Sequence, residues 1–353
     1  MNLNEASEAT KSILESNWKI LRQKNYRMSE TLIPIWWSGP GIGKTTAIRD
    51  LAESLKCDYF STMVLAQRDA GEIGGLCNPD RERGVMNYLQ PSWLPTEMTH
   101  PRMRRGIQYL DEWCQAPVAN QNALGTLLQE RYINEHKFHP NCNIVVSSND
   151  MQHRAGTSAM PSHIKDRFVH LEIEADPEVL LDYMLNNGFK PEITSFLTFR
   201  PKWVYDFQTD VKAYPTPRSW ERANTVLDMK MAPELEYKVL QGIVGDAAAA
   251  DFAGHQRIFR ELPDVNLPLT SPASAPIPTK ADISHALMAA LASKVGSKTI
   301  GNLMKYLKRV PQKEFVVLCM RDVLRRKREL HKHKEVTTWL QNEGSLMTTM
   351  RID

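Results

Sequence analysis

The chain has 353 residues, of which 42% are hydrophobic and 24% are charged, and its formal net charge at pH 7 is +3. These are ordinary values for a soluble globular protein, and the small net charge is by itself no argument for a nucleic-acid partner. No run approaches the roughly 18 apolar residues that a membrane span needs, and the length favours about two to three domains.

The five cysteines are widely spaced, include no CxxC pair and are odd in number. This pattern favours reduced thiols in a cytoplasmic protein over a disulfide framework or a zinc site. The residues after Met1 lack a basic stretch followed by an apolar one, so we expect no secretory signal.

Helices and strands are predicted to alternate in the first half of the chain. A helix with an apolar face is expected over 5–24, and strands are expected at 32–37, 58–65, 107–110, 143–147 and 168–173. Helical patterns separate most of these strands, which is typical of a parallel sheet with helices on both faces. The sequence therefore predicts an α/β fold with a parallel five-stranded sheet.

Residues 38–46, Ser-Gly-Pro-Gly-Ile-Gly-Lys-Thr-Thr, connect the first strand to a helical pattern. Glycines allow backbone N–H groups to turn toward polyphosphate oxygens at the positive end of a helix. Lys44 would contact the β and γ phosphates, and Thr45 would offer its hydroxyl to Mg²⁺. The alternative is a simple Gly-Pro turn before a helix, and Ser38 departs from the usual motif, which starts with glycine. The expected phosphate-binding residues are Gly39, Pro40, Gly41, Ile42, Gly43, Lys44, Thr45 and Thr46.

Two acids, Asp111 and Glu112, end the third expected strand. Asp111 is predicted to hold Mg²⁺ together with Thr45, and Glu112 is predicted to act as the general base for the water that attacks the γ-phosphorus. A solvated strand end is the alternative interpretation. The phosphate loop upstream favours the catalytic one.

Three further polar residues complete the predicted site. Asn149, at the end of the fourth strand, is expected to contact the γ-phosphate or the attacking water, although Asn-Asp also starts ordinary turns. Arg167, before the fifth strand, and Arg218, at the start of a later helix, would bring positive charge to the transition state. Most arginines are exposed and structurally neutral, so position alone does not single out these two.

The remaining chain divides by composition. An excursion over about 77–105 is rich in Pro, Gly and Arg, and residues 84–89 within it have the pattern of a hairpin strand. Helical patterns follow at 178–187, 191–199, 217–229 and 233–260. The sequence predicts a helical domain over 176–262, a Pro-rich linker over 263–280 and further helices over 281–353.

Two basic clusters bear on the class of partner. Residues 321–334 predict a basic helix with Val323, Leu324 and Leu330 as apolar anchors, and a second cluster occupies Arg102 to Arg105. Either cluster would suit nucleic acid or an acidic protein surface. A solvated helix face is the commoner explanation for the first cluster, so nucleic acid is possible but not favoured.

Residues 155–168, Ala-Gly-Thr-Ser-Ala-Met-Pro-Ser-His-Ile-Lys-Asp-Arg-Phe, resemble the EGT…LPEA…DRF stretch of the MoxR family of AAA+ ATPases. Residues 116–131 are similar to that family's AP…Q.ALL…ER pattern, and the resemblance covers about residues 30–262. The chain departs from the family at two places. Residues 113–115 are Trp-Cys-Gln where the family often has Ile-Asn-Arg, and Ala155 replaces a glutamate.

The resemblance implies an AAA+ P-loop NTPase with an αβ nucleotide-binding domain over 1–175, an insert in its second helix at about 77–105, and an all-α lid over 176–262. The insert would face the substrate side of a ring. Arg167 would be the arginine finger that acts on the neighbouring subunit's nucleotide. The resemblance assigns Lys44 and Thr45 to Walker A, Asp111 and Glu112 to Walker B, Asn149 to sensor 1 and Arg218 to sensor 2.

A MoxR-like protein would be a hexameric ring that hydrolyses ATP with Mg²⁺ and remodels a client protein, as a chaperone does. A client with a von Willebrand factor A domain is implied by the resemblance alone. Two alternatives stay open. One is a nucleic-acid-handling ATPase such as a phage-encoded replication loader or helicase-like motor, although the sequence shows no evident helix-turn-helix pattern. The other is a nucleotide-gated scaffold with negligible turnover, which the intact set of predicted catalytic residues disfavours.

Overall fold

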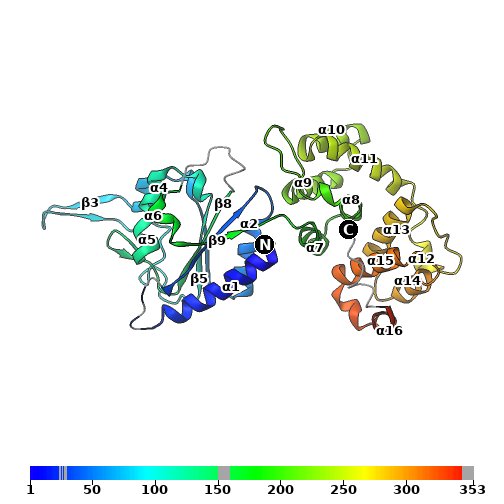
Figure 1. Ribbon diagram of the computed structural model, residues 1–353, viewed down its shortest axis with the longest axis horizontal. Helices are drawn as coiled ribbons and strands as arrows, with labels where there is room; N and C mark the ends of the chain where they lie inside the picture. Colours follow the sequence, from blue (N-terminus) through cyan, green and yellow to red (C-terminus); the bar gives the residue numbers. More distant parts are fainter. Residues whose placement is uncertain (24, 26, 28–29, 150–159, 344–353) are drawn as a thin grey trace. The chain divides into compact units, whose positions relative to one another are not determined.

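The computed structural model describes residues 1–23, 25, 27, 30–149 and 160–343. The chain divides into two compact units, Met1–Asp176 and Pro177–Asp353 (Figure 1). Residues 155–159, which begin the stretch similar to the MoxR family, lie outside the described residues. Among the described residues, no helix combines the length and apolarity that a membrane crossing needs.

The first unit is built on a five-stranded sheet in the order β2-β5-β8-β1-β9, and every neighbouring pair is parallel. The three inner strands are buried along nearly their whole length, as expected when apolar runs are covered on both faces. The parallel five-stranded sheet predicted from the sequence is confirmed. Its strands are β1 (Ile33–Ser38), β2 (Tyr59–Val64), β5 (Gly106–Asp111), β8 (Cys142–Asn149) and β9 (Phe168–Glu172).

Helix α1 (Leu3–Ile20) begins at a capping box formed by Asn2 and packs on α2, β1 and β8. The Trp18 indole N–H donates to the carbonyl oxygen of Asn141 at 2.8 Å, and the Trp36 indole N–H donates to Thr10 Oγ1 at 2.8 Å. These hydrogen bonds fix the helix to the residue that precedes β8 and to β1. The other helices of this unit are α2 (Lys44–Ser54), α3 (Ala70–Gly74), α4 (Val118–Ala123), α5 (Gly125–Glu130) and α6 (Ser162–Lys165).

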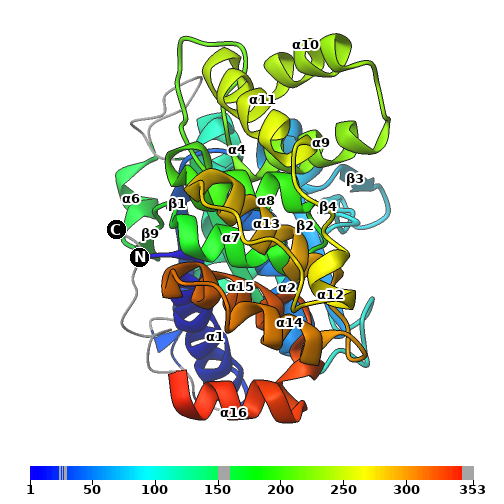
Figure 2. The ribbon, with the colours of Figure 1, turned by 90° about the vertical axis from the view of Figure 1, so that its right-hand side faces the viewer.

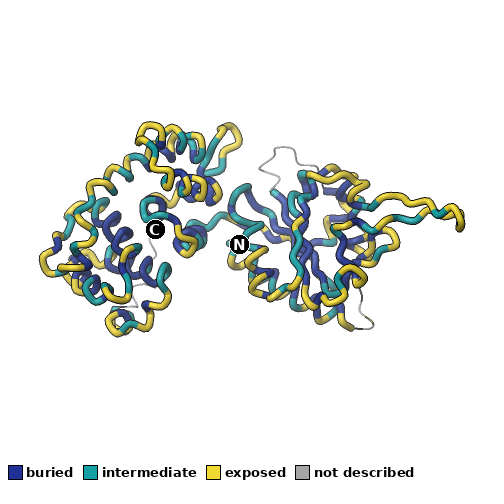
Figure 3. The backbone as a smooth tube through the Cα atoms, turned by 180° about the vertical axis from the view of Figure 1, so that it is seen from behind, coloured by how far each residue is buried: buried dark blue, intermediate teal, exposed yellow. Residues whose placement is uncertain are grey.

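The excursion contains an antiparallel hairpin, β3 (Cys77–Asp80) with β4 (Val85–Tyr88), which projects from the rest of the unit and is largely exposed (Figure 3). A second hairpin, β6 (Tyr132–Ile133) with β7 (His136–Lys137), contacts its base, where the Tyr88 N–H donates to Glu135 Oε1 at 2.7 Å. The sequence predicted the strand at 84–89. It gave no sign of the second hairpin, because two-residue strands carry no periodicity.

The second unit is helical, and α13 lies at its centre, packed against α8, α11 and α15 (Figure 2). Because α13 is surrounded, nine of its fourteen residues are buried and it lacks a polar face. Its helices are α7 (Pro177–Asn186), α8 (Pro191–Phe199), α9 (Pro217–Asp228), α10 (Pro233–Val244), α11 (Asp246–Arg260), α12 (Leu267–Thr270), α13 (Ala281–Lys294), α14 (Ile300–Leu307), α15 (Lys313–Arg326) and α16 (Lys334–Glu343).

Two stretches of the second unit differ from expectation. The single helix predicted over 233–260 is two helices, because Gly245 between them has φ 84° and ψ 163°, a conformation that is essentially restricted to glycine. The segment predicted as a linker over 263–280 contains α12, and Leu269 and Ala275 are buried in the apolar core of this unit. Its prolines therefore shape a packed segment.

Replacing Gly245 by alanine is expected to destabilise the second unit by about 1–3 kcal/mol. A Cβ atom there would lie 2.6 Å from the carbonyl oxygen of Ala213, in addition to the strained φ. Denaturant unfolding followed by circular dichroism measures the effect. Gly242→Ala, on α10 with open space around its Cβ, is the matched control and should be neutral or stabilising. Equal stability of both variants would contradict the prediction.

Candidate functional site

The glycine-rich loop follows the carboxyl end of β1 and leads directly into α2. Gly41 has φ 80° and Gly43 has φ 102°, left-handed conformations that glycine adopts without steric cost. Helix α2 begins at Lys44, immediately after Gly43, so Thr45 and Thr46 lie in its first turn. The first N–H groups of a helix have no partner within the helix and favour an anion. The loop therefore ends at the N-terminus of α2, a position that favours an anion.

Lys44 lies between the ends of two neighbouring strands. Its ammonium group donates to Ser38 Oγ at 2.7 Å, to Asn149 Oδ1 at 3.1 Å and to the carbonyl oxygen of Gly39 at 3.3 Å. Ser38 and Asn149 are register partners at the carboxyl ends of β1 and β8. Ser38, the residue that departs from the motif, thus supplies a buried hydroxyl acceptor for the lysine.

Thr45 and Asp111 meet in the same place. The Thr45 hydroxyl donates to Asp111 Oδ2 at 3.1 Å. A hydroxyl and a carboxylate are hard oxygen ligands of the kind that Mg²⁺ prefers, and Mg²⁺ usually takes its remaining ligands from water and substrate phosphates. The two side chains therefore have the chemistry of magnesium ligands beside the glycine-rich loop, and their binding of the ion stays a prediction.

The other carboxylate oxygen of Asp111, Oδ1, accepts two hydrogen bonds. Ser147 Oγ donates to Asp111 Oδ1, and the Glu112 N–H donates to the same oxygen at 2.9 Å. The Tyr109 hydroxyl lies 2.7 Å from Ser147 Oγ. Burial, and then the negative charge of Asp111, raise the pKa of Tyr109, so its hydroxyl stays protonated.

Sequence reasoning missed Tyr109 and Ser147, although a signal was present. Each stands two residues before a predicted site residue, Asp111 on β5 and Asn149 on β8. Because side chains on a strand alternate between faces, residues two apart share a face of the sheet. A polar residue two positions before a predicted site residue on a buried strand indicates a contact with the site.

Glu112 directly follows Asp111 and has a left-handed backbone, with φ 59° and ψ 43°. Such a conformation is uncommon outside glycine and costs about 1–3 kcal/mol. The turn after it is held by the Cys114 N–H, which donates to Ser148 Oγ at 3.2 Å. Strained backbone of this kind occurs often at functional sites, which supports a special position for Glu112.

Arg167 lies at the amino ends of the sheet strands, whereas the glycine-rich loop lies at their carboxyl ends. It precedes β9, whose first residue, Phe168, pairs with the first residue of the parallel strand β1. β1 has six residues, so the loop at its far end lies roughly 20 Å away at about 3.3 Å per residue. The Arg167 backbone is therefore distant from the phosphate loop of its own chain.

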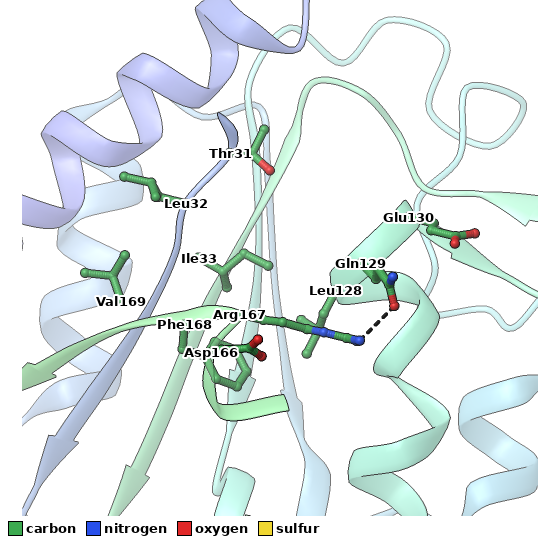
Figure 4. A pocket seen from close by; sticks show the side chains of 10 residues that line it. All are labelled: Thr31, Leu32, Ile33, Leu128, Gln129, Glu130, Asp166, Arg167, Phe168 and Val169. Carbon is green, nitrogen blue, oxygen red and sulfur yellow. Dashed lines mark hydrogen bonds between the residues drawn. The ribbon is translucent and has the colours of Figure 1, made fainter. Parts of the chain in front are cut away.

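The Arg167 side chain is anchored on α5 (Figure 4). Its guanidinium donates to the carbonyl oxygen of Gly125 at 2.6 Å and to Gln129 Oε1 at 2.7 Å. It lines a pocket of about 470 Å³, together with Asp166, Glu130 and the residues that precede β1. The side chain is half-buried and has a defined orientation.

Arg218 belongs to the second unit and is the second residue of α9. The helix begins with a capping box in which the Ser219 N–H donates to Thr216 Oγ1 at 3.1 Å. The Arg218 side chain is exposed. Its part in a nucleotide site remains a prediction.

The basic helix predicted over 321–334 is wrong in extent, although its predicted apolar anchors Val323, Leu324 and Leu330 are buried. Helix α15 ends at Arg326, and the chain leaves the helix at Lys327, where φ is −139°. Arg325 pairs with Asp182 at 2.6 Å, Arg326 donates to Thr194 Oγ1 at 2.7 Å, and Lys327 donates to the Ser293 carbonyl oxygen at 3.1 Å. These cations serve the packing of the second unit.

A family model described as AAA domain (dynein-related subfamily) matches residues 39–168. This span contains Lys44, Asp111, Asn149 and Arg167. Together with the parallel five-stranded sheet, the match confirms the predicted α/β fold of AAA+ P-loop NTPases, followed here by a helical C-terminal part. Among curated proteins, none is similar enough to match.

Among solved structures, one from Cytophaga hutchinsonii ATCC 33406, described as a putative ATPase, is 15% identical with a TM-score of 0.33, and the match covers 73% of this chain and 82% of that one. Two mutants of Thermotoga maritima RuvB are each 14% identical. One has a TM-score of 0.37 and coverage of 89% of this chain and 94% of that one. The other has a TM-score of 0.36 and coverage of 90% and 97%.

Proposed function

We propose that this protein is a MoxR-like AAA+ ATPase that hydrolyses ATP in a ring of identical subunits and uses the cycle to remodel or activate a partner protein. The observation that carries the proposal is the meeting of Lys44, Thr45, Asp111 and Asn149 at the carboxyl ends of β1, β5 and β8. Ligands of open parallel sheets bind at this edge. These residue types bind polyphosphate with Mg²⁺ and act on it.

The chain's residues divide the chemistry between them. The N–H groups of the glycine-rich loop and the Lys44 ammonium bind phosphate oxygens, and Thr45 and Asp111 hold the magnesium ion. When bound, that ion neutralises charge on the phosphates. Glu112 accepts the proton of the attacking water, and Asn149 orients this water or the γ-phosphate.

Arg167 acts on the nucleotide of the neighbouring subunit in this proposal. Arg167 precedes β9 at the amino ends of the strands, so it is distant from a nucleotide bound at the glycine-rich loop of its own chain. Its two bonds to α5 hold the guanidinium in place, and such an arginine stabilises charge that develops in the transition state. Arg218 would act as sensor 2 in the helical lid.

Glu112→Gln is expected to retain ATP but lose hydrolysis by about 10²- to 10⁴-fold, because the amide cannot take the proton of the attacking water. Phosphate release and the nucleotide content of the purified protein measure both effects, and light scattering should show a stable ring. Glu8→Gln, at an exposed carboxylate on α1, is the control. Continued hydrolysis in Glu112→Gln would remove Glu112 as the base.

The same variant tests the class of partner. Loaded with ATP, it should retain a client protein through purification, whereas Lys44→Ala prepared in parallel should retain none. Retention of nucleic acid in its place, with ATPase activity that DNA stimulates in a steeply salt-dependent way, would favour the nucleic-acid-handling alternative.

A further inference from the structure

Two buried hydroxyl groups form a hydrogen-bonded chain that ends at Asp111, and neither has a role in the phosphate-binding and catalytic set described above. Tyr109 and Ser147 are both fully buried, on the neighbouring strands β5 and β8. The Tyr109 hydroxyl is 2.7 Å from Ser147 Oγ, and Ser147 Oγ is hydrogen-bonded to Asp111 Oδ1. The chain of hydroxyls thus leads from the interior of the sheet to the carboxylate that meets Thr45.

The direction of these hydrogen bonds follows from counting protons. An ionised carboxylate only accepts, so Ser147 gives its one hydroxyl proton to Asp111. Ser147 then has no proton left for Tyr109, and the Tyr109 hydroxyl must be the donor to Ser147. All the hydroxyl protons therefore point toward Asp111, an arrangement in which each bond strengthens the next.

We propose that Tyr109 and Ser147 are positioning residues for magnesium binding, an inference that rests on the proposed function. The terminal torsion of an aspartate is broad, so a carboxylate with one free oxygen rotates readily. Ser147 and the Glu112 N–H both hold Oδ1. With that oxygen fixed, Oδ2 remains directed at Thr45, 3.1 Å away, where the ion would bind.

The expected size of the effect comes from partners that orient metal ligands elsewhere. Loss of such a partner typically costs about 10- to 100-fold in metal affinity or activity. Ser147→Ala removes the direct hydrogen bond to Asp111. We expect this variant to need about tenfold more Mg²⁺, or a larger increase, for half-maximal enhancement of ATP-analogue binding. Tyr109→Phe removes the hydroxyl that is hydrogen-bonded to Ser147 and that also interacts with Asp111 and Thr45, and we expect a rise in the same direction.

The experiment titrates Mg²⁺ against the binding of a fluorescent ATP analogue to the full chain. Without Mg²⁺, in EDTA, both variants should bind the analogue within about twofold of the wild type, because the phosphate loop is unchanged. The double variant should need at least as much Mg²⁺ as either single variant, because the Tyr109 hydroxyl interacts with Asp111 and Thr45 as well as with Ser147. Thermal unfolding of each variant checks that the fold is retained.

Tyr59→Phe is the matched control. Tyr59 lies on β2 of the same sheet and its hydroxyl donates to Gln108 Oε1 at 3.1 Å, away from Asp111. Its removal should leave the Mg²⁺ requirement unchanged. If Tyr109→Phe and Ser147→Ala bind with the Mg²⁺ requirement of the wild type, the positioning role is wrong. If the wild type binds no nucleotide or ignores Mg²⁺, the proposed function itself fails.

Discussion

Replacing Lys44 by alanine is expected to abolish nucleotide binding, with a loss of affinity of at least about 100-fold. The ammonium group of Lys44 lies where the loop, β1 and β8 meet, and it is bonded to Ser38 and Asn149. Charge-assisted hydrogen bonds contribute about 1.5–3 kcal/mol each, and every 1.4 kcal/mol is a factor of ten in affinity. Equilibrium binding of a fluorescent ATP analogue measures the loss.

A matched control separates this effect from the loss of any positive charge. Lys19 is an exposed lysine in the last turn of α1, and Lys19→Ala should bind the analogue as the wild type does. Circular dichroism of Lys44→Ala should match that of the wild type, because the removed contacts are local. Undiminished affinity in Lys44→Ala would count against the whole interpretation of the glycine-rich loop.

Arg167→Ala is expected to keep ATP binding but to lose turnover by about 10³-fold or more, the effect attributed to an arginine finger. The bound state should persist because Arg167 lies roughly 20 Å from its own chain's loop, measured along β1. Steady-state phosphate release and analogue binding separate the two effects. Arg104→Ala, an exposed arginine of the same unit, should retain turnover.

Mixing two inactive variants tests whether Arg167 acts on a neighbour. Arg167→Ala subunits retain Glu112, and Glu112→Gln subunits retain Arg167. In a mixed ring, some interfaces therefore join an intact base to an intact arginine, and part of the turnover should return. Wild-type turnover in Arg167→Ala alone would refute the finger assignment. Mixed rings that form but stay inactive would refute its action between subunits.

The parts of this molecule that depend on local sequence could be predicted. The five strands of the parallel sheet are recognisable from apolar residues over stretches of strand length, and the loop over 38–46 needs glycine at positions where the structure has φ of 80° and 102°. Asp111 and Asn149 end neighbouring parallel strands, so their meeting with Lys44 and Thr45 at one sheet edge follows from the fold class.

The features that depend on contacts between distant segments of the chain could not be predicted from the sequence. The bond of Ser147 to Asp111 requires knowing that β5 and β8 are neighbours, and the role of Ser38 requires the position of the Lys44 ammonium. The contact of Arg325 with Asp182 joins helices far apart in sequence. Without that contact, residues 321–334 read as a free basic surface. The sequence around Gly245 is compatible with one long helix, and only the backbone angles of Gly245 separate α10 from α11.

The most direct test of the central claim is the rate at which the purified 353-residue chain releases phosphate from ATP, measured with and without Mg²⁺. We expect release that requires Mg²⁺, that rises per subunit as the protein concentration increases and rings assemble, and that is lost in Lys44→Ala. Absence of phosphate release under ring-forming conditions, or release that Lys44→Ala retains in full, would contradict the proposal that this protein is an ATP-hydrolysing ring.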